Sequence, residues 1–163
     1  LYAAAHYEDP ALQALIKELK FNRRESIAKD LGLLLARGLA SSVSDIDYVI
    51  PLPLAKQRLR ERGFNQAELI AKICAQELAL QVNTDVLLRL HHKKAQSTLK
   101  SWKQREENIA GAFVVRDNAP IQGKRILLID DVWTSGATMN EAARVLREAG
   151  AKDILAAVIA RAS

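Results

Sequence analysis

The stretch "RILLIDDVWTSGATMNEA", residues 125–142, decides the fold. Its opening "RILLID" is a continuous apolar run of the kind that is buried on both faces of a parallel sheet. Asp130 and Asp131 end the run, and small hydroxylated residues then surround Gly136. Ligands of open parallel sheets bind beyond the carboxyl ends of the strands. The stretch therefore predicts a strand, a polar ligand-binding loop and a helix that ends near Gly150.

The rest of the chain alternates helix and strand patterns. Apolar residues recur at helical spacing from about Pro10, from about Ser26 to Ala40, and from about Asn65 to Leu80. Short apolar runs that predict strands are "DIDYVIP", "DVLLRL", "AFVVR" and "DILAAVIAR". We therefore expect an α/β fold of three layers, with a mostly parallel twisted sheet flanked by helices, in a single domain over residues 1–163.

The composition excludes several classes of protein. A hydrophobic fraction of 49% and a charged fraction of 26% are typical of a globular chain and not of a disordered one. The net charge of +5 favours anionic partners, or else a solvated surface of mixed charge. Cys74 is the only cysteine, so we expect a buried inert thiol and no disulfide. No apolar run approaches the ~18 residues that span a bilayer, so we expect no membrane contact and a cytoplasmic location.

The loop after the two aspartates has the chemistry of a sugar phosphate site. Its backbone N–H groups, over residues 134–138, would converge at a helix start, where the helix dipole favours a phosphate. Gly136 permits a positive φ and a close approach of the backbone to a ligand. Thr138 also begins a T-x-x-E capping box with Glu141, which explains Thr138 without a ligand but leaves the acid pair unexplained. Adjacent carboxylates suit the vicinal hydroxyls of a sugar, beside a Mg²⁺ that the ligand carries.

These residues resemble a known motif. "ILLIDDVWTSGAT" is similar to the phosphoribosyl pyrophosphate (PRPP) binding motif of type I phosphoribosyltransferases. The resemblance implies that fold, with Asp130 and Asp131 on the ribose hydroxyls. It implies that the 5-phosphate is bound by Thr134, Ser135, Gly136, Ala137 and Thr138. "PLPLAKQRLRERGFNQAELIA" and "KAQSTLKSWKQREENIAGAF" resemble segments of the ComF (GntX-like) family, which is associated with bacterial competence and DNA use.

The resemblance also assigns two basic segments. The loop over residues 52–62 would bind the pyrophosphate, because arginine suits bidentate phosphate contacts, although these cations could also lie on solvated surface. Its expected contacts are Pro53, Leu54, Lys56, Arg58 and Arg62. A flexible hood over about residues 91–111 would exclude water from the ligand, through Lys93, Lys94, Trp102 and Arg105. Trp102 could instead stack on a nucleobase or single-stranded DNA, or be buried as an anchor of the hood.

Two hypotheses for function follow. In the first, an acceptor displaces pyrophosphate from PRPP·Mg²⁺ through an oxocarbenium-like transition state, and no residue holds the metal directly. No general base for a nucleobase is visible in the sequence, and the acceptor stays open. In the second, the chain is a non-catalytic ligand sensor that binds single-stranded DNA or a helicase of the DNA-uptake machinery. A homodimer is compatible with both.

The chain departs from the ComF pattern in one respect. Full-length members usually carry an N-terminal cysteine zinc ribbon, whereas this chain starts at Leu1 and has only Cys74. We therefore expect that module either to have been removed or never to have been present.

Overall fold

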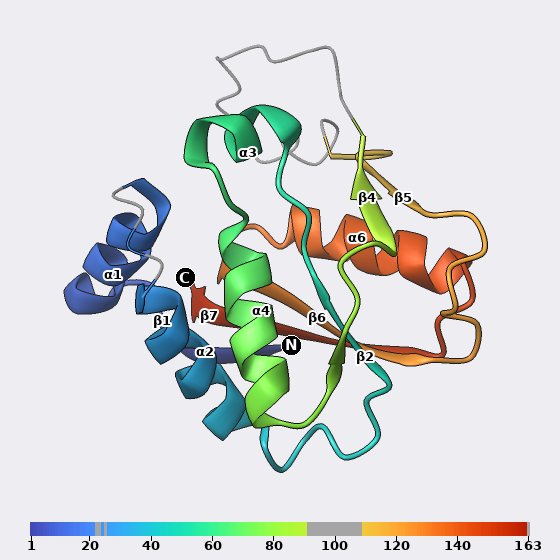
Figure 1. The fold of residues 1–163 in the computed structure, drawn as a ribbon, viewed down its shortest axis with the longest axis horizontal. Coiled ribbons are helices and arrows are strands. Elements are labelled where there is room, and N and C mark those ends of the chain that lie inside the picture. Colours follow the sequence, from blue (N-terminus) through green and yellow to red (C-terminus); the bar gives the residue numbers. More distant parts are fainter. Residues whose placement is uncertain (22–23, 25, 91–108, 163) are drawn as a thin grey trace.

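A five-stranded sheet forms the centre of the protein, and its neighbouring strands all run parallel (Figure 1). The computed structural model describes residues 1–21, 24, 26–90 and 109–162. The strand order is β1 (Tyr2–His6), β7 (Asp153–Arg161), β6 (Arg125–Trp133), β2 (Tyr48–Pro51) and β3 (Gln81–Val82). The predicted parallel sheet is confirmed, and β6 continues past the two aspartates to Trp133.

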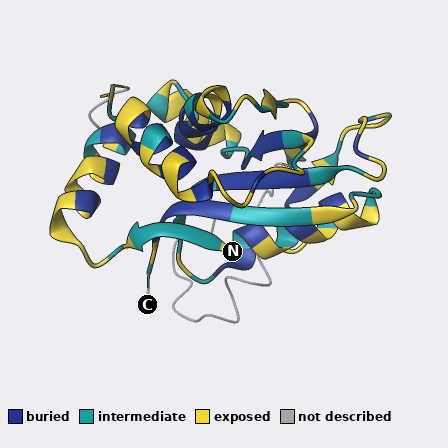
Figure 2. Cartoon of the chain, turned by 90° about the horizontal axis from the view of Figure 1, so that it is seen from below, coloured by how far each residue is buried: buried dark blue, intermediate teal, exposed yellow. Residues whose placement is uncertain are grey.

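Helices cover both faces of this sheet. One face carries α2 (Ser26–Leu39) and α4 (Gln66–Glu77), with α1 (Pro10–Phe21) packed in the same core, and the other carries α6 (Ala137–Glu148). Figure 2 shows the central strands buried between helical layers whose outer faces are exposed. The three-layer architecture is therefore confirmed.

Strand β6 is buried on both sides, because successive side chains of a strand point to opposite faces. Leu127 and Ile129 pack in the core beneath α2 and α4. Ile126 and Leu128 pack in the core beneath α6. This alternation continues into the two aspartates, and it decides where each carboxylate goes.

Two predicted strands lie outside the main sheet. β4 (Leu87–Arg89) and β5 (Phe113–Val115) form a separate antiparallel pair. Leu87 and Phe113 are buried in the core on the α6 side, so the pair packs next to α6. The sequence predicts both strands correctly, but not that they pair with each other.

The basic segment after β2 is helical, where the sequence predicts a loop. The short helix α3 (Lys56–Arg62) buries none of its residues and therefore has no apolar periodicity. The connection that leads into it is fixed at two points. Leu52 N donates to Ile129 O at 2.8 Å, and Asn65 Nδ2 donates to Leu52 O at 3.0 Å.

The composition also led to expectations for Cys74 and for membrane-spanning helices. The predicted burial of Cys74 is confirmed, and burial raises the pKa of its thiol to about 12, which disfavours the reactive thiolate. Among the helices that the structure describes, none combines the length and the apolar character needed to cross a membrane.

Candidate functional site

A cavity of about 510 Å³ opens at the carboxyl ends of β2 and β6. It brings together the aspartate pair, the segment after β2, α3 and the loop before α6. The residues that the sequence predicts for the site and that line this cavity are Pro53, Leu54, Arg58, Arg62, Asp130, Asp131, Thr134 and Thr138. Four polar or aromatic residues of the same lining were not predicted from the sequence, namely Tyr7, Lys20, Gln66 and Arg89.

The two aspartates have different surroundings. Asp131 continues the face of Leu127 and Ile129 and is buried, whereas Asp130 continues the face of Leu128 and is partly exposed to the cavity. Asp131 N donates to Asp130 Oδ1 at 2.8 Å, which fixes the Asp130 carboxyl at the end of the strand. Asp130 also lines a small hollow of about 30 Å³ over the loop before α6, and Asp131 does not.

Asp131 forms an ion pair with a lysine from the other end of the chain. Lys20 Nζ lies 2.5 Å from Asp131 Oδ2, and the two side chains are 21% and 6% exposed. No group of the described residues makes a well-aligned hydrogen bond to this buried Oδ2, so charge attraction is what stabilises it. A buried carboxylate without a counter-charge would cost several kcal/mol.

The pKa of the Asp130 carboxyl is raised well above its ordinary value. Burial is the main cause, and repulsion by Asp131 adds to it. The amide of Asp131 and the charge of Lys20 act in the opposite direction, but are weaker. A titratable group that is perturbed in this way and lies in a cleft is a candidate for function.

Three arginines make the opposite wall of the cavity basic. Arg58 and Arg62 come from α3 and Arg89 from β4, and together with Lys20 they outnumber the two acids by two. Burial lowers the pKa of Arg62 and Arg89, although a guanidinium stays protonated in proteins. Arg62 Nη1 donates to the buried Gln66 Oε1 at 2.5 Å, which orients the arginine. The wall therefore suits a ligand with several negative charges.

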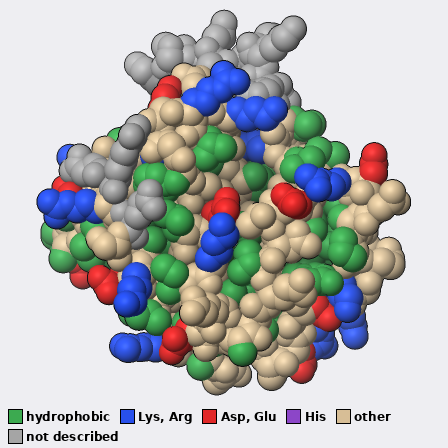
Figure 3. Space-filling view, in the orientation of Figure 1, with side chains coloured by type: hydrophobic (Ala, Val, Ile, Leu, Met, Phe, Trp, Pro, Cys, Tyr) green, Lys and Arg blue, Asp and Glu red, His purple; other side chains and the backbone are tan. Residues whose placement is uncertain are grey.

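Lys56 does not line the cavity, although the sequence predicts it in the same group as Arg58 and Arg62. It lies exposed at the first position of α3. Figure 3 shows basic side chains gathered over α3 at the top of this face of the molecule. Helical spacing explains the difference, because residues 58 and 62 share one side of the helix and residue 56 does not.

The loop before α6 turns at Gly136, which has φ 77° and is the N-cap residue of the helix. A Cβ atom there would lie 2.2 Å from the ring of Trp133, so glycine is required by the indole as well as by φ. The positive φ that the sequence predicts for Gly136 is confirmed, and the close approach to a ligand stays a prediction. No side chain caps α6 through its N-cap residue, which leaves the first turn suited to an anion.

The four other residues of the loop differ in their positions. Ser135 Oγ accepts a hydrogen bond from Ala137 N at 3.3 Å, and Ser135 lines the small hollow together with Thr134 and Thr138. Ala137 is buried and lines neither the hollow nor the large cavity. Its side chain is therefore positioned for packing.

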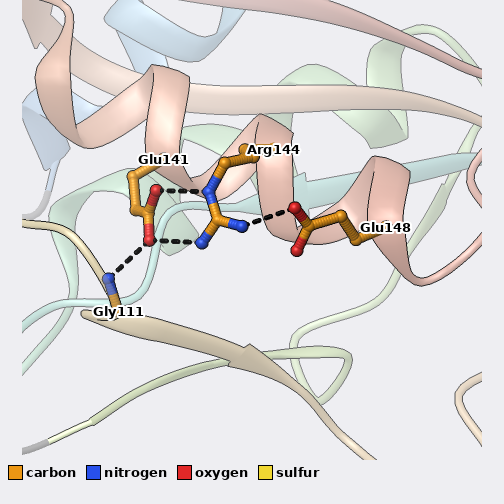
Figure 4. Close-up of polar contacts among 4 residues, drawn as sticks. All are labelled: Gly111, Glu141, Arg144 and Glu148. Atoms are coloured by element: carbon orange, nitrogen blue, oxygen red, sulfur yellow. Dashed lines mark hydrogen bonds and ion pairs between the residues drawn. The ribbon is translucent and has the colours of Figure 1, made fainter.

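The predicted capping box is wrong. Thr138 lies inside the first turn of α6, and Glu141 is engaged elsewhere (Figure 4). The Glu141 carboxylate accepts hydrogen bonds from Arg144 and, at 2.6 Å, from the amide of Gly111. Hydrogen bonds from Arg144 hold the pKa of Glu141 below its ordinary value. Glu141 thus links the segment before β5 to α6 through a hydrogen bond.

Most of the predicted hood, including Lys93, Lys94, Trp102 and Arg105, lies outside the described residues. Its described end reaches the site, because Ile109 lines the large cavity and Gly111 bonds to Glu141. No cluster of three His, Cys, Asp or Glu side chains that could hold a metal occurs in the part of the chain that is described. The acid pair alone offers two carboxylates, one of which already faces Lys20.

Solved structures with a similar arrangement of strands and helices define the class of fold. The glutamine PRPP amidotransferase of Bacillus subtilis, complexed with ADP and GMP, matches 82% of this chain and 26% of its own at a TM-score of 0.57 and 22% identity. A purine phosphoribosyltransferase of Pyrococcus horikoshii matches at a TM-score of 0.50 and 14% identity, over 82% of this chain and 73% of its own. The fold is that of type I phosphoribosyltransferases.

Sequence relatives then narrow the class. The family described as phosphoribosyl transferase domain matches residues 64–163. The chain is 33% identical to DNA utilization protein YhgH of Shigella flexneri, over 94% of this chain and 68% of the relative. It is also 33% identical to Competence protein F of Haemophilus influenzae, over 96% and 70%. The chain belongs to the ComF family of phosphoribosyltransferase-fold proteins.

The raised pKa of Asp130 predicts that this residue destabilises the ligand-free protein. An acid with a raised pKa in the folded state lowers stability as the pH rises from its ordinary value through the folded value. We expect Asp130→Asn to raise the thermal midpoint at neutral pH, with a gain that vanishes as the pH falls toward about 4. Thermal unfolding between pH 4 and 8 measures this. A variant that is less stable than the parent at neutral pH would contradict the prediction.

Proposed function

We propose that the chain binds PRPP, or a related ribose 5-phosphate, in the cavity at the ends of β2 and β6. The observation that carries this proposal is the convergence of the acid pair, the start of α6 with its glycine N-cap, and the basic wall around that cavity. Asp130 and Asp131 would accept hydrogen bonds from the ribose hydroxyls. Loop residues 134–138 would surround the 5-phosphate at the positive end of the helix dipole.

The pyrophosphate half of the ligand would lie against α3. Arg58 and Arg62 line the cavity from this helix, and a guanidinium can bind a phosphate through two parallel hydrogen bonds. The same cations would stabilise the charge that develops on a departing pyrophosphate. A Mg²⁺ that the pyrophosphate oxygens carry would neutralise further charge there. The chain's own residues would thus position the sugar and stabilise the leaving group, and the acceptor stays open.

Ligand binding predicts a thermal shift. PRPP with Mg²⁺ at about 100 times its Kd should stabilise the protein by about 2.7 kcal/mol, which corresponds to about 5–10 °C for a chain of this size. We expect the double change Asp130→Asn, Asp131→Asn to remove the shift, and Arg58→Gln to reduce it. Lys56→Gln is a matched control, because it removes a charge from the same helix outside the cavity. Absence of a shift in the parent protein at millimolar PRPP would contradict the proposal.

We further propose a role in DNA uptake, because the relatives are named as competence and DNA utilization proteins. The names of these relatives are compatible with two kinds of role. The chain could act as an enzyme, or it could act as a ligand sensor that binds single-stranded DNA. One feature favours a nucleic-acid surface in addition to the cavity. Lys56 and Arg60 are exposed on α3 and do not line the cavity, so they are available to a polyanion.

A DNA-binding titration separates the two surfaces. Short single-stranded DNA should bind with an affinity that falls as salt rises. Lys56→Gln with Arg60→Gln should reduce the magnitude of the slope of log K against log salt by about 1.4, because two phosphate contacts are lost. The acid-pair variant should keep this binding. DNA binding that survives the α3 changes but disappears with the acid pair would contradict a separate surface.

A further inference from the structure

We propose that Lys20 is a built-in counter-cation of the acid pair, so that the ribose 5-phosphate half of the ligand binds without Mg²⁺. This inference rests on the proposed function of the cavity. Lys20 of α1 would neutralise part of the negative charge of the two aspartates, as a divalent cation would otherwise do. The cation then matters for the pyrophosphate half alone.

The position of Lys20 is fixed by the helix that carries it. Ile16 and Leu19 are almost fully buried in the core shared with α2, which anchors the C-terminal half of α1. At the other end of the helix, Asp9 Oδ1 accepts hydrogen bonds from Ala11 N at 2.8 Å and from Leu12 N at 3.2 Å. The ammonium group of Lys20 therefore projects from an anchored element into the wall of the cavity.

The charges around the acid pair give this ammonium its role. Asp131 is the more buried of the two acids, and its Oδ2 lies 2.5 Å from Lys20 Nζ. The pair is formally neutral, and Arg62 also attracts Asp131, so Asp130 is the acid that lines the cavity without a direct ion pair among the described residues. A phosphate that enters the site consequently meets an excess of positive charge even in the absence of a metal ion.

The side chains that could act as Mg²⁺ ligands support this role of Lys20. Mg²⁺ prefers six oxygen ligands in octahedral geometry, and the described residues offer no cluster of three acidic or histidine side chains. One of the two carboxylates present is engaged with the ammonium. Without Lys20, two neighbouring carboxylates would repel each other and the incoming phosphate, and a divalent cation would then be needed to offset that charge.

Calorimetry with ribose 5-phosphate tests the inference, because this probe lacks the pyrophosphate that binds Mg²⁺. For the parent protein we expect affinities in excess MgCl₂ and in EDTA that agree within about threefold. For Lys20→Met we expect an affinity in EDTA that is weaker by about tenfold or more, and partial recovery when MgCl₂ is added. Recovery by the metal is a result that a purely structural role of Lys20 would not give.

Two further variants complete the experiment. Lys20→Arg keeps the charge and should bind in EDTA nearly as the parent does. Lys17→Met removes a lysine from the same helix that lies outside the acid-pair cavity, and it should leave the affinity and its independence of Mg²⁺ unchanged.

The contrary outcomes are distinct. Parent protein that binds ribose 5-phosphate only with Mg²⁺ would overturn this inference and leave the proposed function intact, whatever the stability of the variants. Binding by Lys20→Met in EDTA as tight as that of the parent would also overturn it. Parent protein that binds neither ribose 5-phosphate nor PRPP under any of these conditions would overturn both proposals.

Discussion

The Asp131 carboxyl group is buried at the end of the sheet, and its ion pair with the ammonium group of Lys20 stabilises it there. The penalty for burying an isolated carboxylate is several kcal/mol, so the site requires α1 to lie where it does. The helix meets this requirement because its apolar face is buried with α2 in the core on one side of the sheet. The ion pair thus links the architecture of the N-terminal helices to the chemistry at the end of β6.

Strand β6 divides the site into two halves through its alternation. Over residues 126–129, the even-numbered residues face α6, and the odd-numbered residues face the layer of α2 and α4. At the end of the strand, Asp130 therefore lies with the loop before α6, and Asp131 lies with Lys20. A sugar that contacts both carboxylates would bridge the two layers of the fold. Its phosphate and its pyrophosphate would lie on different elements, namely the start of α6 and the basic face of α3.

The parts of the fold that sequence analysis predicted are those with a strong local pattern. The apolar run of β6, the acid pair and the spacing of α1, α2, α4 and α6 are local features, and the parallel three-layer architecture follows from their alternation. Helix α3 was missed because it buries no residue and so has no apolar period to detect. The pairing of β4 with β5 was missed because a strand pattern does not identify its partner.

Distance along the chain explains what was missed in the site. Lys20 and Asp131 are 111 positions apart, and nothing in the local sequence of α1 distinguishes Lys20 from its neighbour Lys17. Arg89 occupies a short strand whose position relative to the acid pair depends on the antiparallel pair. Lys56 was predicted to contact the ligand but does not line the cavity. Basic composition alone does not indicate which residues of α3 face the cavity.

The most direct test of this account is a crystal structure of the protein with ribose 5-phosphate bound. The account predicts the phosphate against the amides of residues 134–138 at the start of α6, the ribose hydroxyls on Asp130 and Asp131, and Lys20 still beside Asp131. A sugar phosphate bound elsewhere, or one whose phosphate lies far from Gly136, would contradict the account.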